Sequence, residues 1–308
     1  MRILVTGCAG RLGRVLLPKL LAAADVRGVI GIDIVKPAFT HPRFAFIRAD
    51  IRDPQLANHF AEIDALIHLA FVVMQADLKE RRHDREYMRD INVAGGQNVF
   101  NAAAAQGVGT VVHLSSAAVY ALPAQTEWIA ESHPRAALPG FGYAEDKVEL
   151  ENWLDSFETL HPAIRLVRLR PHVILGPHAH PFLKTLLRVP LYPTTGAAVQ
   201  CVHEDDVVHA IRLALFNVAR GAFNLACSDA HTYGAIYRQL HPLALPLPLA
   251  AVQALLRKAW RFGYGTDPAW AQALRYSLKL DIRGARAGLG WTPRTGFLDI
   301  CRATLKRR

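Results

Sequence analysis

Residues 1–13, MRILVTGCAGRLG, decide the fold of this chain. Ile3, Leu4 and Val5 form a short apolar run that is typical of a strand buried on both faces of a parallel sheet. Residues 6–13 then spell T-G-x-x-G-x-x-G, and apolar residues at helical spacing follow them. A glycine-rich turn between a strand and a helix is the setting in which a dinucleotide pyrophosphate binds.

Each glycine of this turn has its own predicted role. Gly7 lets the chain turn tightly, Gly10 lets the backbone approach a pyrophosphate, and Gly13 lets the helix pack closely on the strand. The N-terminus of the helix, where Arg11 and Leu12 lie, offers free N–H groups and partial positive charge to an anion. We therefore expect these five residues to bind the cofactor.

An acidic residue follows at the end of the second predicted strand, residues 29–33. Asp33 can accept hydrogen bonds from the ribose hydroxyls of adenosine and would repel a 2′-phosphate. NAD is therefore expected rather than NADP, although Lys36 lies close by. A tight turn without a ligand is the alternative, and the combination of strand, helix and acid argues against it.

The composition of the chain argues against several classes of protein: nucleic-acid-binding, disulfide-rich and zinc proteins. The chain has 308 residues, 51% of them hydrophobic, and a net charge of +10. Its basic residues are scattered without an aromatic-interleaved stripe, so no nucleic-acid partner is expected. The four cysteines include no C-x-x-C pair, which argues against a disulfide framework or zinc site and is compatible with a cytoplasmic protein.

No membrane partner is expected either. The first apolar run is too short for a signal peptide and leads directly into the glycine turn. Residues 243–256 are apolar, but the stretch is too short to span a bilayer and contains Pro246 and Pro248. Either a hydrophobic substrate pocket or an ordinary core helix would account for it.

Strands and helices alternate through the first half of the chain, which predicts a doubly wound, Rossmann-type parallel sheet. We expect an NAD-binding domain over residues 1–176 and a mainly substrate-binding part over 177–308. Segments near 199–226 return to the first domain. The expected strands are residues 3–5, 29–33, 44–47, 65–70, 110–116 and 164–169, and the expected helices are 56–60, 77–105 and 144–160.

Tyr143 and Lys147 are four residues apart and share one face of a predicted helix. An ammonium near a phenol favours the phenolate and lowers the pKa of the tyrosine, which would suit Tyr143 to general acid/base chemistry. Ser115 and Ser116 end a strand predicted beside that helix, so a hydroxyl there could bind a substrate oxygen. Taken alone, such a Tyr/Lys pair is more often a surface pair.

Further motifs follow in a fixed order along the chain. They are TGCAGRLG (6–13), Asp33, DIRD (50–53), HLAF (68–71), INVAGGQNV (91–99), LSSAAVY (114–120), YAEDK (143–147), RPHVILGP (170–177), VHEDDVVHAI (202–211), FNLA (223–226) and LGWTPRTGF (289–297). In this order and spacing they resemble the extended short-chain dehydrogenase/reductases of the NAD-dependent epimerase/dehydratase superfamily.

The resemblance implies roles for particular residues. Tyr143 would be the acid/base, Lys147 would bind the nicotinamide ribose and tune Tyr143, and Ser116 would hold the reacting oxygen. It also implies a homodimer formed through the helices at 77–105 and 144–160. The other implied cofactor contacts are Asp50 and Ile51 at the adenine, Leu69, Ala70 and Phe71 along the ribose and pyrophosphate, Asn92 in support of the active-site helix, Ser115, and Pro171 and Val173 beside the nicotinamide.

Departures from the family pattern bear on the substrate. Val173 stands where sugar-nucleotide members carry Asn, and Val199 or Gln200 stands where they carry Arg. Ala117 and Ala118 replace the Asp-Glu pair of the dehydratases. The pattern therefore favours a dehydrogenase or reductase of a secondary alcohol or ketone, with a UDP-hexose type epimerase as the alternative. A non-catalytic, NAD(P)-binding regulatory module is a third possibility, against which the intact Ser, Tyr and Lys argue.

Two other groups of residues were weighed for chemistry. His172, His178 and His180 cluster after the sixth strand, but a metal site needs further ligands in good geometry, so none is expected. Asp205 and Asp206 are interpreted as the start of a helix, where carboxylates cap free N–H groups.

Overall fold

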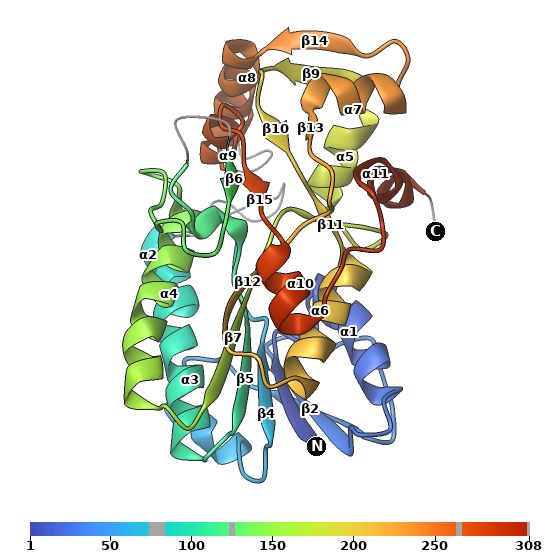
Figure 1. The fold of residues 1–308 in the computed structure, drawn as a ribbon. Helices are drawn as coiled ribbons and strands as arrows, with labels where there is room; N and C mark the ends of the chain where they lie inside the picture. The colour runs from blue at the N-terminus through green and yellow to red at the C-terminus, as the bar shows by residue number, and fades with distance from the viewer. Residues whose placement is uncertain (74–83, 123–126, 263–266, 307–308) are drawn as a thin grey trace.

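The computed structural model describes residues 1–73, 84–122, 127–262 and 267–306. Seven strands, all parallel, form a central sheet in the order β12-β7-β5-β4-β1-β2-β3 (Figure 1). They are β1 (Arg2–Thr6), β2 (Gly28–Asp33), β3 (Phe44–Arg48), β4 (Ala65–His68), β5 (Thr110–Leu114), β7 (Arg165–Pro171) and β12 (Gly221–Leu225). The predicted doubly wound parallel sheet is confirmed.

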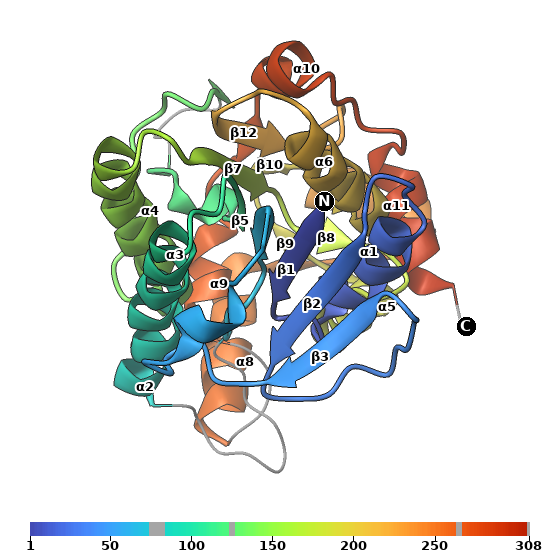
Figure 2. The same cartoon turned by 90° about the horizontal axis from the view of Figure 1, so that it is seen from below.

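Helices cover both faces of this sheet (Figure 2). One face carries α1 (Arg11–Leu21) and α6 (Glu204–Phe216), and the other carries α3 (Gly96–Ala105) and α4 (Gly142–Leu160). Ile3 and Val5 of β1 pack into the core beneath α1 and α6, whereas Leu4 packs into the core beneath α3 and α4. Burial on both faces explains why β1 is apolar without alternation.

The smaller elements lie mostly after residue 173. Four pairs of short strands there are β6 (Trp128–Ile129) with β15 (Lys279–Leu280), β8 (Ile174–Leu175) with β11 (Val202–His203), β9 (Leu191–Thr194) with β14 (Leu245–Pro248), and β10 (Ala198–Val199) with β13 (His231–Thr232). The helices are α5 (Pro181–Arg188), α7 (Tyr233–Leu240), α8 (Leu249–Arg261), α9 (Ala269–Ala273), α10 (Arg283–Leu289) and α11 (Phe297–Leu305). Short 3₁₀ turns cover Leu56–His59 and Ala117–Val119.

The helix predicted over residues 77–105 is not one regular helix. Its first part, 77–83, lies outside the described residues, and the rest is α2 (Arg85–Arg89), a π-helical turn (Asp90–Gly95) and α3. At this turn the chain packs too closely for side chains, because a Cβ on Gly95 would lie 2.8 Å from the Ile51 side chain. Such π-turns are frequent at functional sites.

The apolar stretch at 243–256 is also different from expectation. It forms β14 and most of α8, and within α8 only Gln253 is buried. Leu243 and Leu255 are 87% and 62% exposed, so the interpretation as a core helix is wrong. In the described part of the chain, every helix is too short or too polar to cross a membrane.

The last third of the chain does not form a separate domain. α6 and β12 return to the central sheet, and α10 packs against both of them. Trp291, after α10, is fully buried and donates its indole N–H to the Asp206 carbonyl oxygen at 2.9 Å. The division at residue 176 remains a prediction.

Candidate active site

The sheet order reverses between β1 and β4, and ligands of doubly wound folds bind beyond the strand ends at such a point. Gly7 follows β1 with φ +69°, and a Cβ there would lie 2.6 Å from the Ala70 backbone nitrogen. A Cβ on Gly13 would lie 2.2 Å from the Cys8 carbonyl oxygen. The glycine loop is therefore held against the chain after β4, and neither glycine can carry a side chain without displacing backbone.

The start of α1 fits a bound pyrophosphate. Its N-cap, Gly10, has no side-chain hydrogen bond, and no acidic residue lies in the first turn, where Arg11 and Leu12 stand. The first N–H groups of the helix are thus free of a protein side-chain cap, and the local field favours an anion. These features fit the cofactor-binding role predicted for residues 7–13.

Asp33 lies where the adenosine ribose is expected. It ends β2, and its carboxylate accepts hydrogen bonds from the backbone N–H of Ala9 at 2.9 Å and of Val35 at 3.1 Å. These bonds tie the carboxylate to the glycine loop and hold its negative charge there. A 2′-phosphate would meet that charge, which fits NAD better than NADP.

The segment after β4 runs along the glycine loop. The Leu69 N–H donates to the Thr6 carbonyl oxygen at 3.1 Å, and Ala70 is the residue that excludes a side chain at position 7. The Phe71 ring reaches further, to the predicted catalytic residues. Its centroid is 5.3 Å from that of Tyr143 and 3.8 Å from the Lys147 ammonium nitrogen.

Asp50 and Ile51, which were predicted to flank the adenine, make contacts within the protein. The Asp50 carboxylate accepts from the Arg52 guanidinium at 2.6 Å, which holds the pKa of Asp50 below its usual range. The Ile51 side chain is buried in the core beneath α3 and α4. Whether either also flanks adenine stays a prediction.

Asn92 joins two parts of the site. Its side-chain oxygen accepts from the Val72 N–H at 2.8 Å, and its amide donates to the Val72 carbonyl oxygen at 3.0 Å and to the Asp146 carboxylate at 2.8 Å. The π-helical turn that carries Asn92 is thereby tied to the segment after β4 and to α4.

Tyr143 and Ser116 come together as predicted from their motifs. Tyr143 lies in the first turn of α4, and the Ser116 hydroxyl lies near enough to its phenol to favour the phenolate form. Ser116 follows β5 and caps the 3₁₀ turn, accepting from the Ala118 N–H at 3.1 Å. Phe141 and Trp270 pack against the Tyr143 ring with centroids 5.9 and 5.3 Å away.

The expected effect of Lys147 on Tyr143 is not found in this structure. Burial raises the pKa of Tyr143, and the nearby Ser116 hydroxyl opposes that rise. The Lys147 ammonium instead donates to the Leu114 carbonyl oxygen at 2.9 Å. Burial lowers the pKa of Lys147 to about 7, with Glu151 and Asp146 opposing the shift. An ammonium with so low a pKa is only partly charged near neutral pH.

Glu151 is a buried anion that the sequence analysis missed. It lies one turn after Lys147 and is fully buried. It accepts from the Ser115 hydroxyl at 2.5 Å and from the Arg170 guanidinium at 2.9 and 2.5 Å, while Arg135 approaches to 3.2 Å. The Tyr-x-x-x-Lys-x-x-x-Glu spacing was a signal for it, because all three side chains share one helix face.

This network uses two residues predicted from motifs. Ser115, expected at the cofactor, has its hydroxyl committed to Glu151. Arg170 also donates to the Tyr120 hydroxyl at 2.9 Å, which in turn donates to Asn224 at 2.5 Å. The network therefore fixes the strand ends that carry Ser116 to the helix that carries Tyr143.

Positions beside the predicted nicotinamide and substrate are largely buried. Pro171 ends β7 in register with Leu225, and the Val173 N–H donates to the His172 ring at 2.8 Å. Gln200, 2% exposed, donates to the Cys227 carbonyl oxygen and accepts from the Leu280 N–H, both at 2.6 Å. Gln200 thus cannot replace the missing Arg of sugar-nucleotide members without breaking these bonds.

The other candidates have structural roles. Asp205 and Asp206 lie in the first turn of α6, as predicted, but the predicted capping by their carboxylates is wrong: the cap is His203, whose ring accepts from the Asp205 N–H at 3.2 Å, and Asp206 accepts from the Arg294 N–H at 3.2 Å. His178 pairs with Glu204 at 2.6 Å, and in the described ranges no group of His, Cys, Asp and Glu is arranged to hold a metal.

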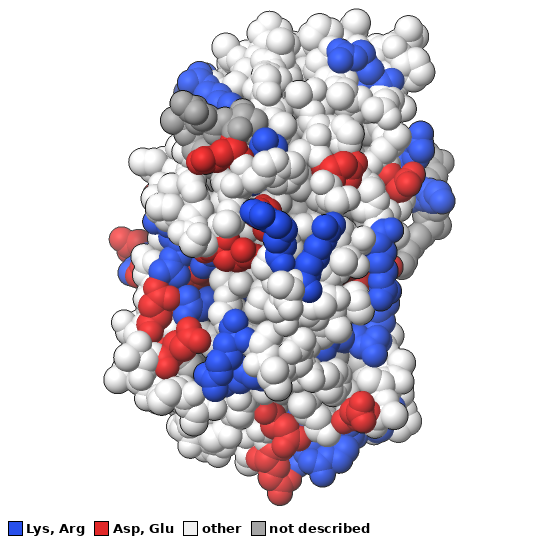
Figure 3. Space-filling model, in the orientation of Figure 1, with Lys and Arg blue, Asp and Glu red and all other residues white. Residues whose placement is uncertain are grey.

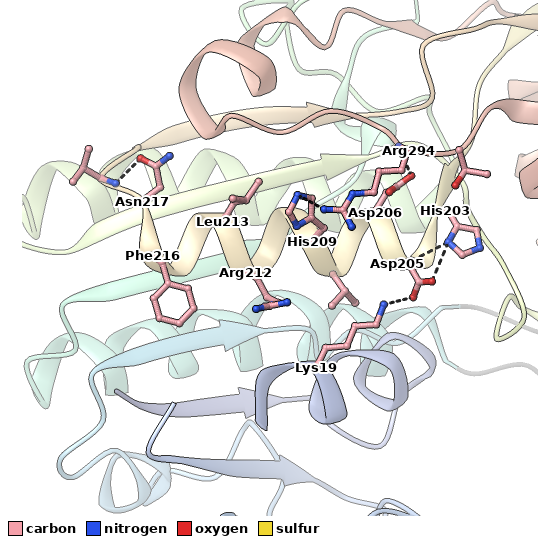
Figure 4. Close-up of a pocket in the computed structure, with 13 residues that line it drawn as sticks. Lys19, His203, Asp205, Asp206, His209, Arg212, Leu213, Phe216, Asn217 and Arg294 are labelled. Carbon is pink, nitrogen blue, oxygen red and sulfur yellow. Dashed lines mark hydrogen bonds and ion pairs between the residues drawn. The ribbon is translucent and has the colours of Figure 1, made fainter. Parts of the chain in front are cut away.

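A cavity of about 710 Å³ opens along α6 (Figure 4). In it Lys19 of α1 faces Asp205, and Arg294 donates to the His209 ring at 3.0 Å. None of the predicted catalytic or cofactor residues lines this cavity.

A Rossmann-type sheet with a glycine loop and a Ser, Tyr and Lys cluster at its strand ends defines a dinucleotide-dependent class of protein. The chain belongs to the NAD dependent epimerase/dehydratase family, whose family model matches residues 3–226. NAD is thus the dinucleotide cofactor of this protein, and the cofactor contacts of the glycine loop and Asp33 remain predictions.

Two curated proteins and one solved structure are similar to this chain. A UDP-glucose 4-epimerase of Mycolicibacterium smegmatis is 32% identical over 192 residues, 59% of this chain and 58% of that protein. An uncharacterized protein of Mycobacterium tuberculosis is 28% identical over 316 residues, 94% of this chain but 31% of that protein. The chain thus spans less than two thirds of the length of both. A dTDP-glucose 4,6-dehydratase structure from Streptomyces venezuelae, with NAD and TYD bound, has the same fold, with a TM-score of 0.77, 23% identity, and coverage of 99% of this chain and 96% of that one.

Proposed function

We propose that this protein is an NAD-dependent oxidoreductase that transfers a hydride at a secondary alcohol or ketone of a small molecule. The observation that carries the proposal is the convergence of Ser116, Tyr143 and Lys147 at the strand ends where the glycine loop lies: Ser116 follows β5, Lys147 donates to the last carbonyl oxygen of β5, and Phe71 contacts both Tyr143 and Lys147. NAD, when bound, supplies the hydride acceptor or donor.

The residues of the chain would divide the remaining work. Ser116 orients the substrate oxygen, and Tyr143 moves the proton on that oxygen as general acid or base. Lys147 holds the nicotinamide ribose and, in its charged form, favours the phenolate of Tyr143. The Phe71, Phe141 and Trp270 rings around Tyr143 keep this proton transfer away from bulk water.

A UDP-hexose type epimerase is the second candidate, because the relative from Mycolicibacterium smegmatis carries that name. An epimerase would use the same residues and return the hydride to the substrate. Buried Val199 and Gln200 in place of Arg, and Val173 in place of Asn, weaken this candidate. A non-catalytic NAD(P)-binding module is the third, and the intact Ser116, Tyr143 and Lys147 oppose it.

Mass spectrometry of the cofactor released from the purified protein separates these candidates. Weakly held NAD is expected for a dehydrogenase that exchanges cofactor at each turnover, and NADH formation is then screened over alcohols and ketones. Tightly retained, partly reduced NAD would instead favour the epimerase. Retained NADP would overturn the role given to Asp33.

The proposed protein is a cytoplasmic homodimer. The faces of α3 and α4 away from the sheet are the interface expected from the family resemblance. Sedimentation at micromolar concentration tests this, and a monomer would contradict it.

A further inference from the structure

One end of the molecule carries positive charge and no acidic residue. Residues 177–203 and 230–262, here called the acid-free lobe, contain no Asp or Glu. The Lys and Arg residues of this lobe are Lys184, Arg188, Arg238, Arg257, Lys258 and Arg261. In Figure 3 the end formed by α7, α8, β9 and β14 shows blue and white atoms, and red atoms begin only below it.

The same end exposes large apolar side chains. Leu245 of β14 is 62% exposed, and Leu191, its partner in the register of β9, is 42% exposed. Leu243, before β14, is 87% exposed, and Phe262, which caps α8, is 70% exposed. These side chains lie in two places, at the paired strands β9 and β14 and at the end of α8, and exposed apolar side chains of this number are a sign of a surface that is covered by something else.

α8 combines both features along one helix. Leu255 and Phe262 lie two turns apart on one edge of its exposed side, Lys258 is exposed beside them, and Arg257 and Arg261 are exposed nearer the opposite edge. On its other side Gln253 is buried and donates to the Ala271 carbonyl oxygen of α9 at 3.3 Å. A surface helix with apolar residues flanked by Lys and Arg is the arrangement that lies in the interface of an anionic bilayer.

We propose that the acid-free lobe docks on an anionic lipid membrane, with Leu243, Leu245, Leu255 and Phe262 entering the headgroup region. The charge of the lobe argues for this partner over a second copy of the chain. Two copies meeting through this face would bring like charges together, whereas acidic lipids attract them.

The strands of the lobe argue against a partner protein that adds a strand. Pro193 in β9 and Pro246 and Pro248 in β14 have no N–H to donate to such a partner. The lobe is also linked to the candidate active site through α9, which packs on α8 and whose Trp270 contacts the Tyr143 ring. The inference concerns an interaction surface and does not depend on the reaction proposed above.

Flotation of the full chain with lipid vesicles tests this proposal. Binding is expected with vesicles of phosphatidylcholine containing about a third phosphatidylglycerol, and not with phosphatidylcholine alone. The double variant L255S/F262S and the triple variant R257Q/K258Q/R261Q should each bind the anionic vesicles about tenfold more weakly or worse. All variants should keep the wild-type unfolding temperature, because the replaced side chains are exposed.

The matched control, R27Q/R48Q/R283Q, removes the same charge from exposed positions outside the lobe and should bind like the wild type. An equal loss in this control would show a mere net-charge effect and overturn the proposal. Unchanged binding of L255S/F262S would do the same, since no apolar insertion would then occur. Absence of wild-type binding to the anionic vesicles would also overturn the proposal. If sedimentation then shows a dimeric wild type and monomeric lobe variants, the lobe contacts a second copy of the chain instead of a membrane.

Discussion

Replacing Lys147 with Met should make the protein more stable at neutral pH while abolishing turnover. Burial lowers the pKa of Lys147 from its ordinary 10.5 to about 7. That difference corresponds to about 4–5 kcal/mol that the lysine costs the folded state below pH 7. Loss of the bond to the Leu114 carbonyl oxygen would offset about 1–2 kcal/mol of the gain. The net gain is about 3 kcal/mol, or about 4–5 °C in unfolding temperature for a chain of this length.

The sign of this effect depends on pH in a defined way. Between about pH 7 and 10.5 the unfolded lysine holds a proton that the folded one has lost, so the stability of the wild type rises with pH through this window. The advantage of K147M should therefore be largest at and below pH 7, and by pH 10.5 it should reverse to a deficit of about 1–2 kcal/mol, the cost of the lost bond to Leu114. Thermal unfolding of both proteins across this range measures it, with the exposed residue Lys36→Met as control. A variant less stable than the wild type at pH 7, or a difference that is constant with pH, would refute the reasoning.

Three further predictions follow from the contacts of the site. Phe71→Ala should raise the pKa of Lys147 by about 1 or more toward the ordinary lysine value, because the ring that buries the ammonium is lost. NMR titration of ¹³C-labelled lysine measures this pKa, and an unchanged value would contradict the prediction. Glu151→Gln should cost about 3–5 kcal/mol in urea unfolding, since Arg170 would stay buried without its anion, and wild-type stability would show that the network contributes little. Gly7→Ala should weaken NAD binding about tenfold or more in calorimetry, because residue 7 has a positive φ and a Cβ there would clash with the Ala70 backbone. The control Gly109→Ala places its Cβ in open space and should leave NAD affinity unchanged. Equal affinities for the wild type and both variants would argue against the glycine-loop site.

The central sheet was predictable because local sequence patterns are enough to identify its strands. β1, β4 and β5 are buried on both faces, so their apolar runs need no tertiary information to be found. The glycine turn was predictable for a similar reason, since the tight strand-to-helix junction leaves no room for a Cβ at positions 7 and 13.

The rest depended on contacts between distant segments. Trp270 reaches Tyr143 from α9, and no spacing in the sequence connects the two. The low pKa of Lys147 comes from the depth of its burial under Phe71, which composition and periodicity do not report. The core-helix interpretation of residues 243–256 was wrong because an apolar pattern shows that a segment needs cover but not whether the chain itself supplies that cover.

The most direct test of the proposed active site is Tyr143→Phe, with NAD affinity by calorimetry and turnover on the substrate found in the screen. The change removes the hydroxyl that lies near Ser116 and keeps the ring that packs on Phe71, Phe141 and Trp270. We expect NAD affinity within about twofold of the wild type and turnover lower by about 100-fold or more, the range of a lost general acid/base. Turnover that survives at the wild-type rate would contradict the account.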